Sequence, residues 1–238
     1  MQVKVISVEN VELDSDQMPT SRTPRKPGRP KGDDDLRDKI LDEAGLAFAE
    51  AGFAGARTRD IASGAGVNQG LIRYYFGSKE QLFEQVFRRY GGLISGNRHV
   101  LLDRLLAQPT PYSVEDVIRA YLQPQWDMKY SGPNGAAFVR LQARLHAEPE
   151  NQALQLRREV YDASVKRYID TLAPLLPHLS RELLSLRMSF LIGTYMFMLN
   201  DLGRIEDLTE GSITGLGKDE MLDNLVAFLS AGLRAPAP

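Results

Sequence analysis

The sequence predicts an all-α protein in which a small N-terminal group of three helices precedes a larger helical domain. Apolar residues recur at intervals of three and four along most of the 238 residues, which is the spacing of amphipathic helices. No alternation of period two persists, so we expect no strands. Proline and glycine separate the periodic stretches and mark the ends of the helices.

The composition is that of a globular protein, and it excludes several kinds of chemistry. Hydrophobic residues make up 43% and charged residues 25% of the chain, which has no cysteine and three histidines. Disulfides, thiol catalysis and thiolate metal sites are therefore excluded, and a histidine-rich metal site is not expected. We expect neither a metal nor a cofactor.

Nothing in the sequence predicts export or a membrane span. The most apolar window, Met188–Leu199, has about 12 residues, whereas a bilayer needs about 20. Residues 1–16 lack an apolar core beside a basic flank. We therefore expect a cytoplasmic protein that does not bind membranes.

The formal net charge of -2 hides an uneven distribution along the chain. Residues 1–19 carry a net charge of -3, residues 20–89 one of +3, and residues 90–238 one of -2. Basic charge is densest between Ser21 and Gly32, where three prolines preclude regular structure. We predict a flexible basic arm within residues 1–34, and a solubilising tail is the alternative.

The first helix after the arm begins behind Asp33, Asp34 and Asp35, because negative charge suits a helix N-terminus. Apolar residues then recur at helical spacing up to Gly52. Glycine at this position is a stop signal, so the first helix is expected to end there.

Two very short helices come next, and their spacing is typical of a helix-turn-helix. The second helix starts at Thr58, a suitable N-cap, and ends at Gly64; the third covers about residues 69–75. Gly66 supplies the positive φ that the turn between them needs. Helices this short depend on packing against their neighbours, so we predict one three-helix domain over residues 35–84.

The third helix presents a polar face that suits the major groove of DNA. Amide side chains pair with adenine edges, arginine donates to guanine, and glycine permits close approach of the backbone. Residues at helix ends usually contact phosphates. We predict base contacts from Asn68, Gln69, Gly70 and Arg73, and phosphate contacts from Thr58, Tyr74 and Lys79. The alternative is an ordinary solvated helix face.

The segments Thr58–Ala62 and Gly66–Leu82 resemble the DNA-binding domain of the TetR (tetracycline-repressor) family of bacterial regulators. The likeness covers about Leu36–Phe87 and implies the same division between phosphate-contacting and base-reading residues. Many members carry Ser or Thr at the place of Asn68 and Tyr at the place of Arg73. These differences bear on which operator is read.

The basic arm contains a second resemblance. The segment Lys26–Lys31 is similar to the Gly-Arg-Pro core of an AT-hook, with Pro27 where an arginine usually precedes the glycine. An extended Gly-Arg-Pro places its arginine in a narrow A·T minor groove. We therefore expect DNA contacts from Arg25, Arg29 and Lys31.

Helical patterns continue through residues 85–235, and two of them predict a dimer. The helix expected over residues 181–202 is apolar on nearly every side, and the one over 218–232 has an apolar stripe. A two-fold dimer would bury both and set two reading heads on a palindromic operator. A monomeric core is the alternative. The remaining helices are expected at 78–107, 114–129, 136–147 and 152–176.

By its resemblance to the family, the domain over residues 85–235 is expected to enclose an effector cavity. Aromatic and Met side chains with a few polar tips suit a largely apolar small molecule, although plain core is the alternative for each. Arg140 and Arg144 would either meet an anionic ligand or remain solvated. The expected lining is Tyr121, Trp126, Phe138, Gln142, His146, Tyr168, Met188 and Tyr195, with Met128 and Tyr161 as further candidates.

The fold class is thus an N-terminal helix-turn-helix domain followed by a larger helical ligand-binding and dimerisation domain. The function that it implies is a ligand-responsive transcription regulator, a repressor released from its operator by a small molecule. A transcriptional activator and a ligand-independent DNA-binding protein remain alternatives. A helical enzyme is a distant third, because the motifs of phosphate loops, nucleophile elbows and zinc helices are absent.

Overall fold

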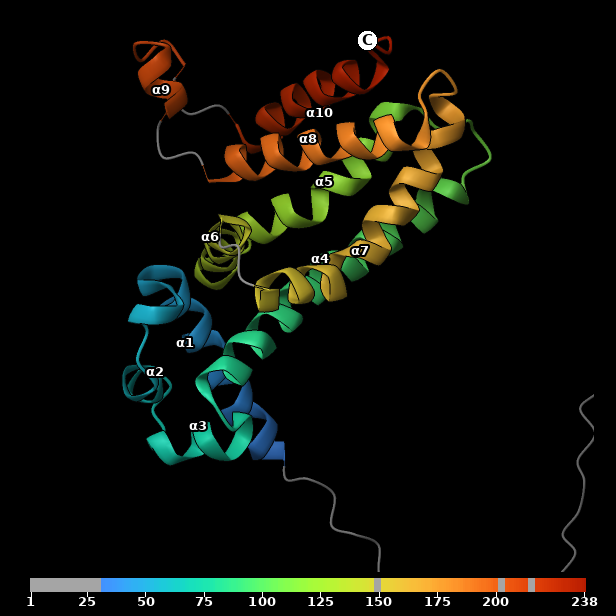
Figure 1. Cartoon of the computed structure of the whole chain (residues 1–238). Helices are drawn as coiled ribbons and strands as arrows, with labels where there is room; N and C mark the ends of the chain where they lie inside the picture. Colours follow the sequence, from blue (N-terminus) through green and yellow to red (C-terminus); the bar gives the residue numbers. More distant parts are fainter. Residues whose placement is uncertain (1–30, 148–150, 201–203, 214–216) are drawn as a thin grey trace, which may run out of the picture.

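The computed structural model describes residues 31–147, 151–200, 204–213 and 217–238 (Figure 1). Every regular element in these ranges is helical, which confirms the all-α class. The α-helices are α1 (Lys31–Gly55), α2 (Thr58–Gly64), α3 (Gln69–Phe76), α4 (Lys79–Leu106), α5 (Val114–Tyr130), α6 (Pro133–Ala147), α7 (Asn151–Leu172), α8 (Arg181–Leu199), α9 (Arg204–Leu208) and α10 (Lys218–Arg234).

Helices α1, α2 and α3 form a compact unit with the first turns of α4 at one end of the molecule (Figure 1). Phe48, Ile61 and Phe76 are at most 3% exposed in its core. The ring of Phe48 meets that of Phe83 on α4 edge-on, with the centroids 5.1 Å apart. This burial holds in place two helices that are too short to be stable alone.

The turn between α2 and α3 has the conformation that the sequence predicts. Gly66 has a φ of 67°, in the left-handed region that favours glycine. The backbone N of Val67 donates to the Ala62 carbonyl at 2.9 Å, and Ala62 itself is buried. The start of α3 is therefore fixed against the end of α2.

Helix α4 joins this unit to the larger domain (Figure 1). Its N-cap is Ser78, whose Oγ accepts a hydrogen bond from the Gln81 backbone N at 3.2 Å. With 28 residues, α4 is about 42 Å long at 1.5 Å per residue. It packs against α1 as well as α5 and α7, so one rigid element touches both domains.

Helices α5, α6, α7, α8 and α10 form the larger domain, and α8 and α10 lie side by side far from α2 and α3 (Figure 1). Ser113 and Asp116 form a capping box at the start of α5, and Ser180 caps α8. Apolar side chains of α4, α5, α6, α7, α8 and α10 make up a second core. Helix α6 packs on both α1 and α5, which supports the junction of the two domains.

Two helix boundaries differ from the predicted ones at prolines. Helix α6 begins at Pro133 and not at residue 136, because proline in a first turn lacks only an N–H that no helical bond uses. Helix α7 ends at Leu172, and Pro174 lies in a 3₁₀ turn that follows it. Proline thus starts one helix and ends another.

The first helix and the glycine-rich loop also depart from expectation. Helix α1 begins inside the predicted arm, at Lys31, and continues beyond Gly52, whose φ of 71° interrupts the helical geometry. Helix α8 ends at Leu199, and residues 201 and 202 of its predicted extent lie outside the described ranges. Helix α9 is a five-residue helix in the glycine-rich segment between Gly203 and Gly217, where the sequence predicts no helix.

Helix α8 is long and apolar enough to cross a membrane when only its length and composition are considered. The apolar window Met188–Leu199 is shorter, because it covers only the C-terminal part of this helix. A single helix of this kind is weak evidence, since a core helix passes the same test. In the fold, α8 packs against α5, α6, α7 and α10.

Candidate nucleic-acid interface

The two faces of α3 differ as the sequence predicts. Ile72 and Phe76 are each 3% exposed and belong to the core, whereas Tyr74 on the opposite face is 76% exposed. The four predicted base-reading residues are also exposed: Asn68, Gln69, Gly70 and Arg73. The polar face of α3 is therefore available to a partner.

Six of the seven predicted contact residues of the helix-turn-helix border one shallow hollow. Its volume is about 480 Å³, and it brings together the start of α2, the exposed face of α3 and the start of α4. Tyr74 does not border it. The predicted contact residues in the hollow are Thr58, Asn68, Gln69, Gly70, Arg73 and Lys79.

Several of these side chains already form hydrogen bonds within the protein. Asn68 is the N-cap of α3, and its Oδ1 accepts from the Gly70 backbone N at 2.8 Å. The Gln69 Nε2 donates to Thr58 Oγ1 at 3.0 Å, which links the starts of α2 and α3. An amide side chain forms two hydrogen bonds with one adenine only if both its donor and its acceptor are free. In this arrangement Asn68 orients α3, while Gln69 and Arg73 keep acceptor and donor groups exposed.

The start of α4 favours an anion. Lys79 is its first residue, and the Nζ lies 4.7 Å from the centre of the Phe53 ring and donates to the Ala54 carbonyl at 3.4 Å. The pKa of the next side chain, Glu80, is lowered by a hydrogen bond from its own backbone N–H and by one from Ser78. A helix N-terminus that stabilises a carboxylate also suits a phosphate.

The predicted contacts of the arm cannot be placed in the same way. Arg25 and Arg29 lie outside the described residues. Lys31 is the first residue of α1, but its side chain also lies outside them. Their contacts with DNA stay a prediction.

A separate cavity of about 350 Å³ lies in the larger domain, between α4, α5, α6, α7 and α8. Four of the ten candidate lining residues border it: Tyr121, Gln142, Tyr161 and Tyr195. Arg140 and Arg144 do not border it and are exposed. The side chain of His146 lies outside the described residues.

Other residues expected at the cavity lie elsewhere. The indole Nε1 of Trp126 donates to the Lys218 carbonyl at 3.1 Å, which ties α5 to α10. The ring of Phe138 packs on those of Phe87 and Tyr90, and Met188 is 1% exposed in the second core. The Tyr168 hydroxyl donates to the Arg98 carbonyl at 2.8 Å, and the half-buried Met128 packs against both cores. None of these residues borders the cavity.

Comparison with known families decides the membership of the chain. Residues 40–86 match the profile described as "Bacterial regulatory proteins, tetR family". Residues 119–232 match the profile described as "Tetracyclin repressor-like, C-terminal domain". The chain belongs to the TetR family. Membership extends over both domains, because the two matches together span more than half of the chain.

Individual TetR-family relatives are similar over part of their length. The repressor NicS of Pseudomonas putida is 35% identical over 136 residues, which are 56% of this chain and 58% of NicS. The repressor KstR2 of Mycolicibacterium smegmatis is 35% identical over 77 residues, 32% of this chain and 38% of KstR2. The chain thus matches less than two-thirds of either relative.

Solved structures of the family share the fold of both domains. A TetR-like regulator from a Rhodococcus species has a TM-score of 0.60 at 19% identity, covering 89% of this chain and 98% of that one. The fatty acid degradation regulator FadR from Bacillus halodurans has a TM-score of 0.56 at 18% identity, covering 84% and 99%. Likeness at this level of identity concerns the fold alone.

Sequence reasoning missed most of the residues that border the cavity of this TetR-family protein, among them the buried Arg98 on α4. It is 3% exposed, and its Nε donates to the Tyr121 carbonyl at 2.9 Å. A signal was present, because Arg98 stands four residues after Ile94 and four before Leu102 on the buried stripe of α4. An arginine at such a position is a polar residue inside the core.

Among the described residues, no group of three or more His, Asp or Glu side chains is placed to hold a metal ion. The exposed helix-turn-helix and the cavity are the two candidate binding sites.

Proposed function

We propose that this protein is a homodimeric transcriptional repressor of the cytoplasm that releases its operator when a small molecule binds the cavity. The observation that carries the proposal is the helix-turn-helix hollow, where predicted contact residues from α2, α3 and the start of α4 meet. The family membership supports the same function.

In the proposed complex α3 enters the major groove. Arg73 donates to guanine, Gln69 contacts a neighbouring base, and Gly70 lets the backbone approach. Phosphates on either side are bound by Thr58, Tyr74 and Lys79. The arm residues Arg25, Arg29 and Lys31 reach an adjacent minor groove.

The proposed dimer forms through α8 and α10, which leave large apolar side chains in water. Phe190 and Phe197 on α8 are 62% and 64% exposed, and Phe228 on α10 is 68% exposed. Leu186 adds to the same surface. A two-fold axis pairs each such patch with its own copy, and the two reading heads then suit a palindromic operator.

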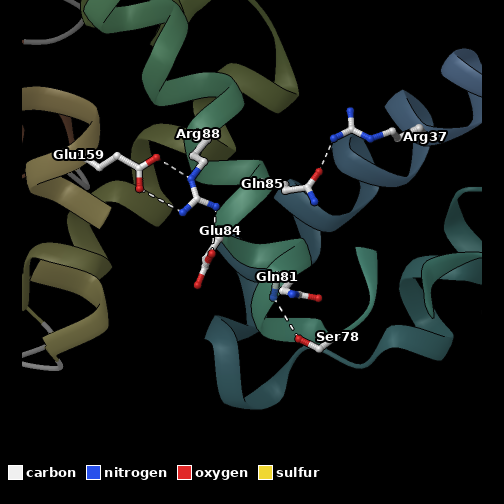
Figure 2. Close-up of polar contacts among 7 residues, drawn as sticks. All are labelled: Arg37, Ser78, Gln81, Glu84, Gln85, Arg88 and Glu159. Carbon is white, nitrogen blue, oxygen red and sulfur yellow. Dashed lines mark hydrogen bonds and ion pairs between the residues drawn. The ribbon is translucent and has the colours of Figure 1, made fainter. Parts of the chain in front are cut away.

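The proposed coupling between cavity and operator runs along α4. Near its start, the Arg88 guanidinium binds Glu159 of α7 through two hydrogen bonds of 2.7 and 3.1 Å, and it also pairs with Glu84 (Figure 2). Arg88 thereby lowers the pKa of the Glu159 carboxyl. A short distance away, Arg37 of α1 hydrogen-bonds Gln85 (Figure 2). A ligand that moves α7 against α4 therefore changes the position of Ser78 and Lys79 at the DNA.

Linkage fixes the energetics of this mechanism. A ligand that prefers the state with misaligned reading heads is bound more weakly when DNA is present, by the same factor by which it weakens DNA binding. The usual coupling is about 1 to 3 kcal/mol.

The first experiment tests DNA recognition. The full chain is used to select duplexes from a random pool, and the selected site is then located by footprinting beside its genes. Arg73→Ala is expected to weaken binding to that site by about 1 to 3 kcal/mol, since one paired contact to a base is lost. Arg104→Ala, at the far end of α4, is the control that keeps wild-type affinity. Failure of the wild-type chain to enrich any sequence contradicts the proposal.

The second experiment tests the response. Ligands that raise the melting temperature of the protein are added to the complex with operator, and its dissociation is followed by fluorescence anisotropy. Release of DNA is the expected result for a repressor. Tighter binding would favour an activator, an operator complex insensitive to every binder would contradict induction, and turnover of a ligand would indicate an enzyme.

A further inference from the structure

Arg98 is a buried cation for which the structure supplies no anionic partner. Its side chain is 3% exposed and borders the 350 Å³ cavity, and no described carboxylate pairs with it. Its Cζ lies 3.8 Å from the centre of the Tyr121 ring. Arginine stays protonated even when buried, so this charge persists inside the protein.

The hydrogen bonds of Arg98 leave donors unused. Its Nε donates to the Tyr121 carbonyl at 2.9 Å, and its Nη2 donates to Gln125 Oε1 at 3.2 Å. Arginine has five N–H donors. The remaining donors have no acceptor among the described residues.

Two glutamine amides continue this series of hydrogen bonds across the cavity. Because Gln125 Oε1 accepts from Arg98, its Nε2 faces Gln142 and donates to Oε1 of that residue at 2.7 Å. The Nε2 of Gln142 is then left without an acceptor among the described residues. Tyr161, on the same wall, has a buried hydroxyl without a hydrogen-bond partner. The cavity therefore offers hydrogen-bond donors, which suit a ligand that carries acceptor atoms.

Most of the other charged residues around the cavity are also basic. Its lining contains two further arginines, Arg157 and Arg158, and one acid, Asp162. Asp162 lies at 4.0 Å from Lys166 on the outer side of α7, so its charge is shared with another cation. A bound anion would enter a site of net positive charge.

We propose that the cavity binds a small organic carboxylate whose charged group pairs with Arg98 and accepts from Gln142 Nε2. The body of the ligand then lies against the apolar side chains of Leu154, Val165, Ile192 and Met196, which border the same cavity. The inference deepens the proposed function, on which it rests, by giving the effector an anionic head group.

The shape of the donors favours a carboxylate over other acceptors. A guanidinium donates two parallel hydrogen bonds that match the two oxygens of a carboxylate. A cavity of about 350 Å³ lies at the small end of ligand sites, which suits one ring or a medium chain and a single head group. Pairing with the ligand would also relieve the unfavourable burial of a lone cation.

The test compares acids with their neutral amides on the full-length protein. Binding of octanoate and benzoate, and of octanamide and benzamide, is measured by calorimetry without DNA. At least one acid is expected to bind about tenfold to a hundredfold more tightly than its amide, the usual effect of a hydrogen bond to a charged group. Equal affinity of both acids and their amides overturns the proposal, and so does the absence of binding by both acids at millimolar concentration.

Variants assign the effect to Arg98. Arg98→Met is expected to abolish the preference for the acid, and Arg98→Lys to retain part of it, because lysine keeps the charge but not the paired donors. Arg140→Met, on the exposed side of α6, is the matched control and keeps the preference. Circular dichroism verifies that each variant is folded. If Arg98→Met does not fold, the comparison of acid with amide on the wild type still decides.

These outcomes are independent of the repressor proposal. Loss of the preference for acids would leave the selection of operator DNA untouched. Absence of sequence-specific DNA binding would contradict the repressor proposal even if octanoate or benzoate binds at Arg98.

Discussion

At the scale of single residues, Asn68 shows how one side chain divides its hydrogen bonds between fold and function. Its oxygen accepts from the Gly70 backbone N at 2.8 Å and so satisfies one of the unpaired amides at the start of α3. A Cβ on Gly70 would lie 3.2 Å from that oxygen, so a larger residue would press on the cap. The side chain holds the helix that carries Arg73 and Tyr74.

The first prediction separates capping by Asn68 from base reading. Asn68→Ala is expected to lower the free energy of unfolding by about 1 kcal/mol, whereas Asn68→Ser, which also caps, is expected to keep it close to wild type. Urea denaturation checks both values. Operator affinity is expected to fall in Asn68→Ala, which lacks the cap, and to be retained in Asn68→Ser, which keeps it. Loss of affinity in a stable Asn68→Ser variant would show that the amide reads a base.

At the scale of helices, the sequence predicts starts better than ends. Ser78, Ser113 and Ser180 are N-caps whose side chains accept from the third backbone N of their helix, a pattern visible in sequence. The sequence predicts a break at Pro133, where α6 in fact begins, because proline is found both after the end of a helix and in its first turn. Helix α9 escaped prediction, since five residues are too few for a periodic pattern.

The second prediction concerns the close contact of α4 with α7. A Cβ on Gly91 would lie 2.7 Å from Tyr161 Oη and from Val160 Cγ1, which is too close for any side chain. Gly91→Ala is therefore expected to destabilise the protein by about 1 to 3 kcal/mol through overpacking. Thermal denaturation measures the effect.

The neighbouring glycine is the control for this substitution. Nothing lies within 4 Å of a Cβ on Gly92, which is exposed on the same helix. Gly92→Ala is expected to stabilise the protein by about 0.5 to 1 kcal/mol, because alanine is the better helix former. Equal effects of Gly91→Ala and Gly92→Ala would show that α4 and α7 are not in close contact there.

The third prediction concerns the ion pair that joins the start of α5 to the end of α10. The guanidinium of Arg234 hydrogen-bonds the Glu115 carboxylate and lowers the pKa of this group to about 2 from its usual 4.5. A lowered folded-state pKa means that the pair stabilises the fold above pH 4.5 and that this contribution disappears as the pH falls toward 2. Both side chains are about 40% exposed, so solvent limits the contribution to about 0.5 to 1 kcal/mol.

Glu115→Gln tests this dependence. Its free energy of unfolding in urea is expected to be lower than that of the wild type at pH 7, and the difference is expected to shrink at pH 3. Arg234→Met serves as the matched control. The double variant with Glu115→Gln and Arg234→Met is expected to lose no more free energy of unfolding than either single variant. A difference that stays constant from pH 7 to pH 3 would contradict the assignment.

At the scale of the whole molecule, the two candidate sites differ in how far their residues are spread along the chain. The residues of the DNA-facing hollow lie between Thr58 and Lys79, within one supersecondary motif that local signals specify. The cavity residues lie between Arg98 and Met196 on five helices. Their meeting depends on packing between distant helices, which periodicity does not reveal. For this reason the sequence predicts most of the residues that border the hollow but only some of those that border the cavity.

The two sites nevertheless share α4. Lys79 and Arg98 are separated by 19 residues, or about 29 Å at 1.5 Å per residue of helix. A rigid helix transmits a small tilt at one end to the other. The contacts of Arg88 with Glu159 and of Arg37 with Gln85 lie between the two sites, where α4 meets α7 and α1 (Figure 2).

The fourth prediction concerns the proposed dimer, on which cooperative binding to a palindromic operator would depend. Phe228 is 68% exposed on α10, and burying a phenylalanine contributes about 1.5 to 3 kcal/mol. A two-fold interface contains every residue twice, so Phe228→Glu is expected to weaken dimerisation by about 3 to 6 kcal/mol, or about 100-fold to 10,000-fold. Sedimentation at micromolar concentration should then show a dimer for the wild type and a monomer for the variant, and operator affinity should fall with it.

Leu208→Glu, at the equally exposed Leu208 of α9, is the control that leaves the dimer intact. A monomeric wild type would contradict the proposed dimer. A variant that remains dimeric would show that the interface lies elsewhere.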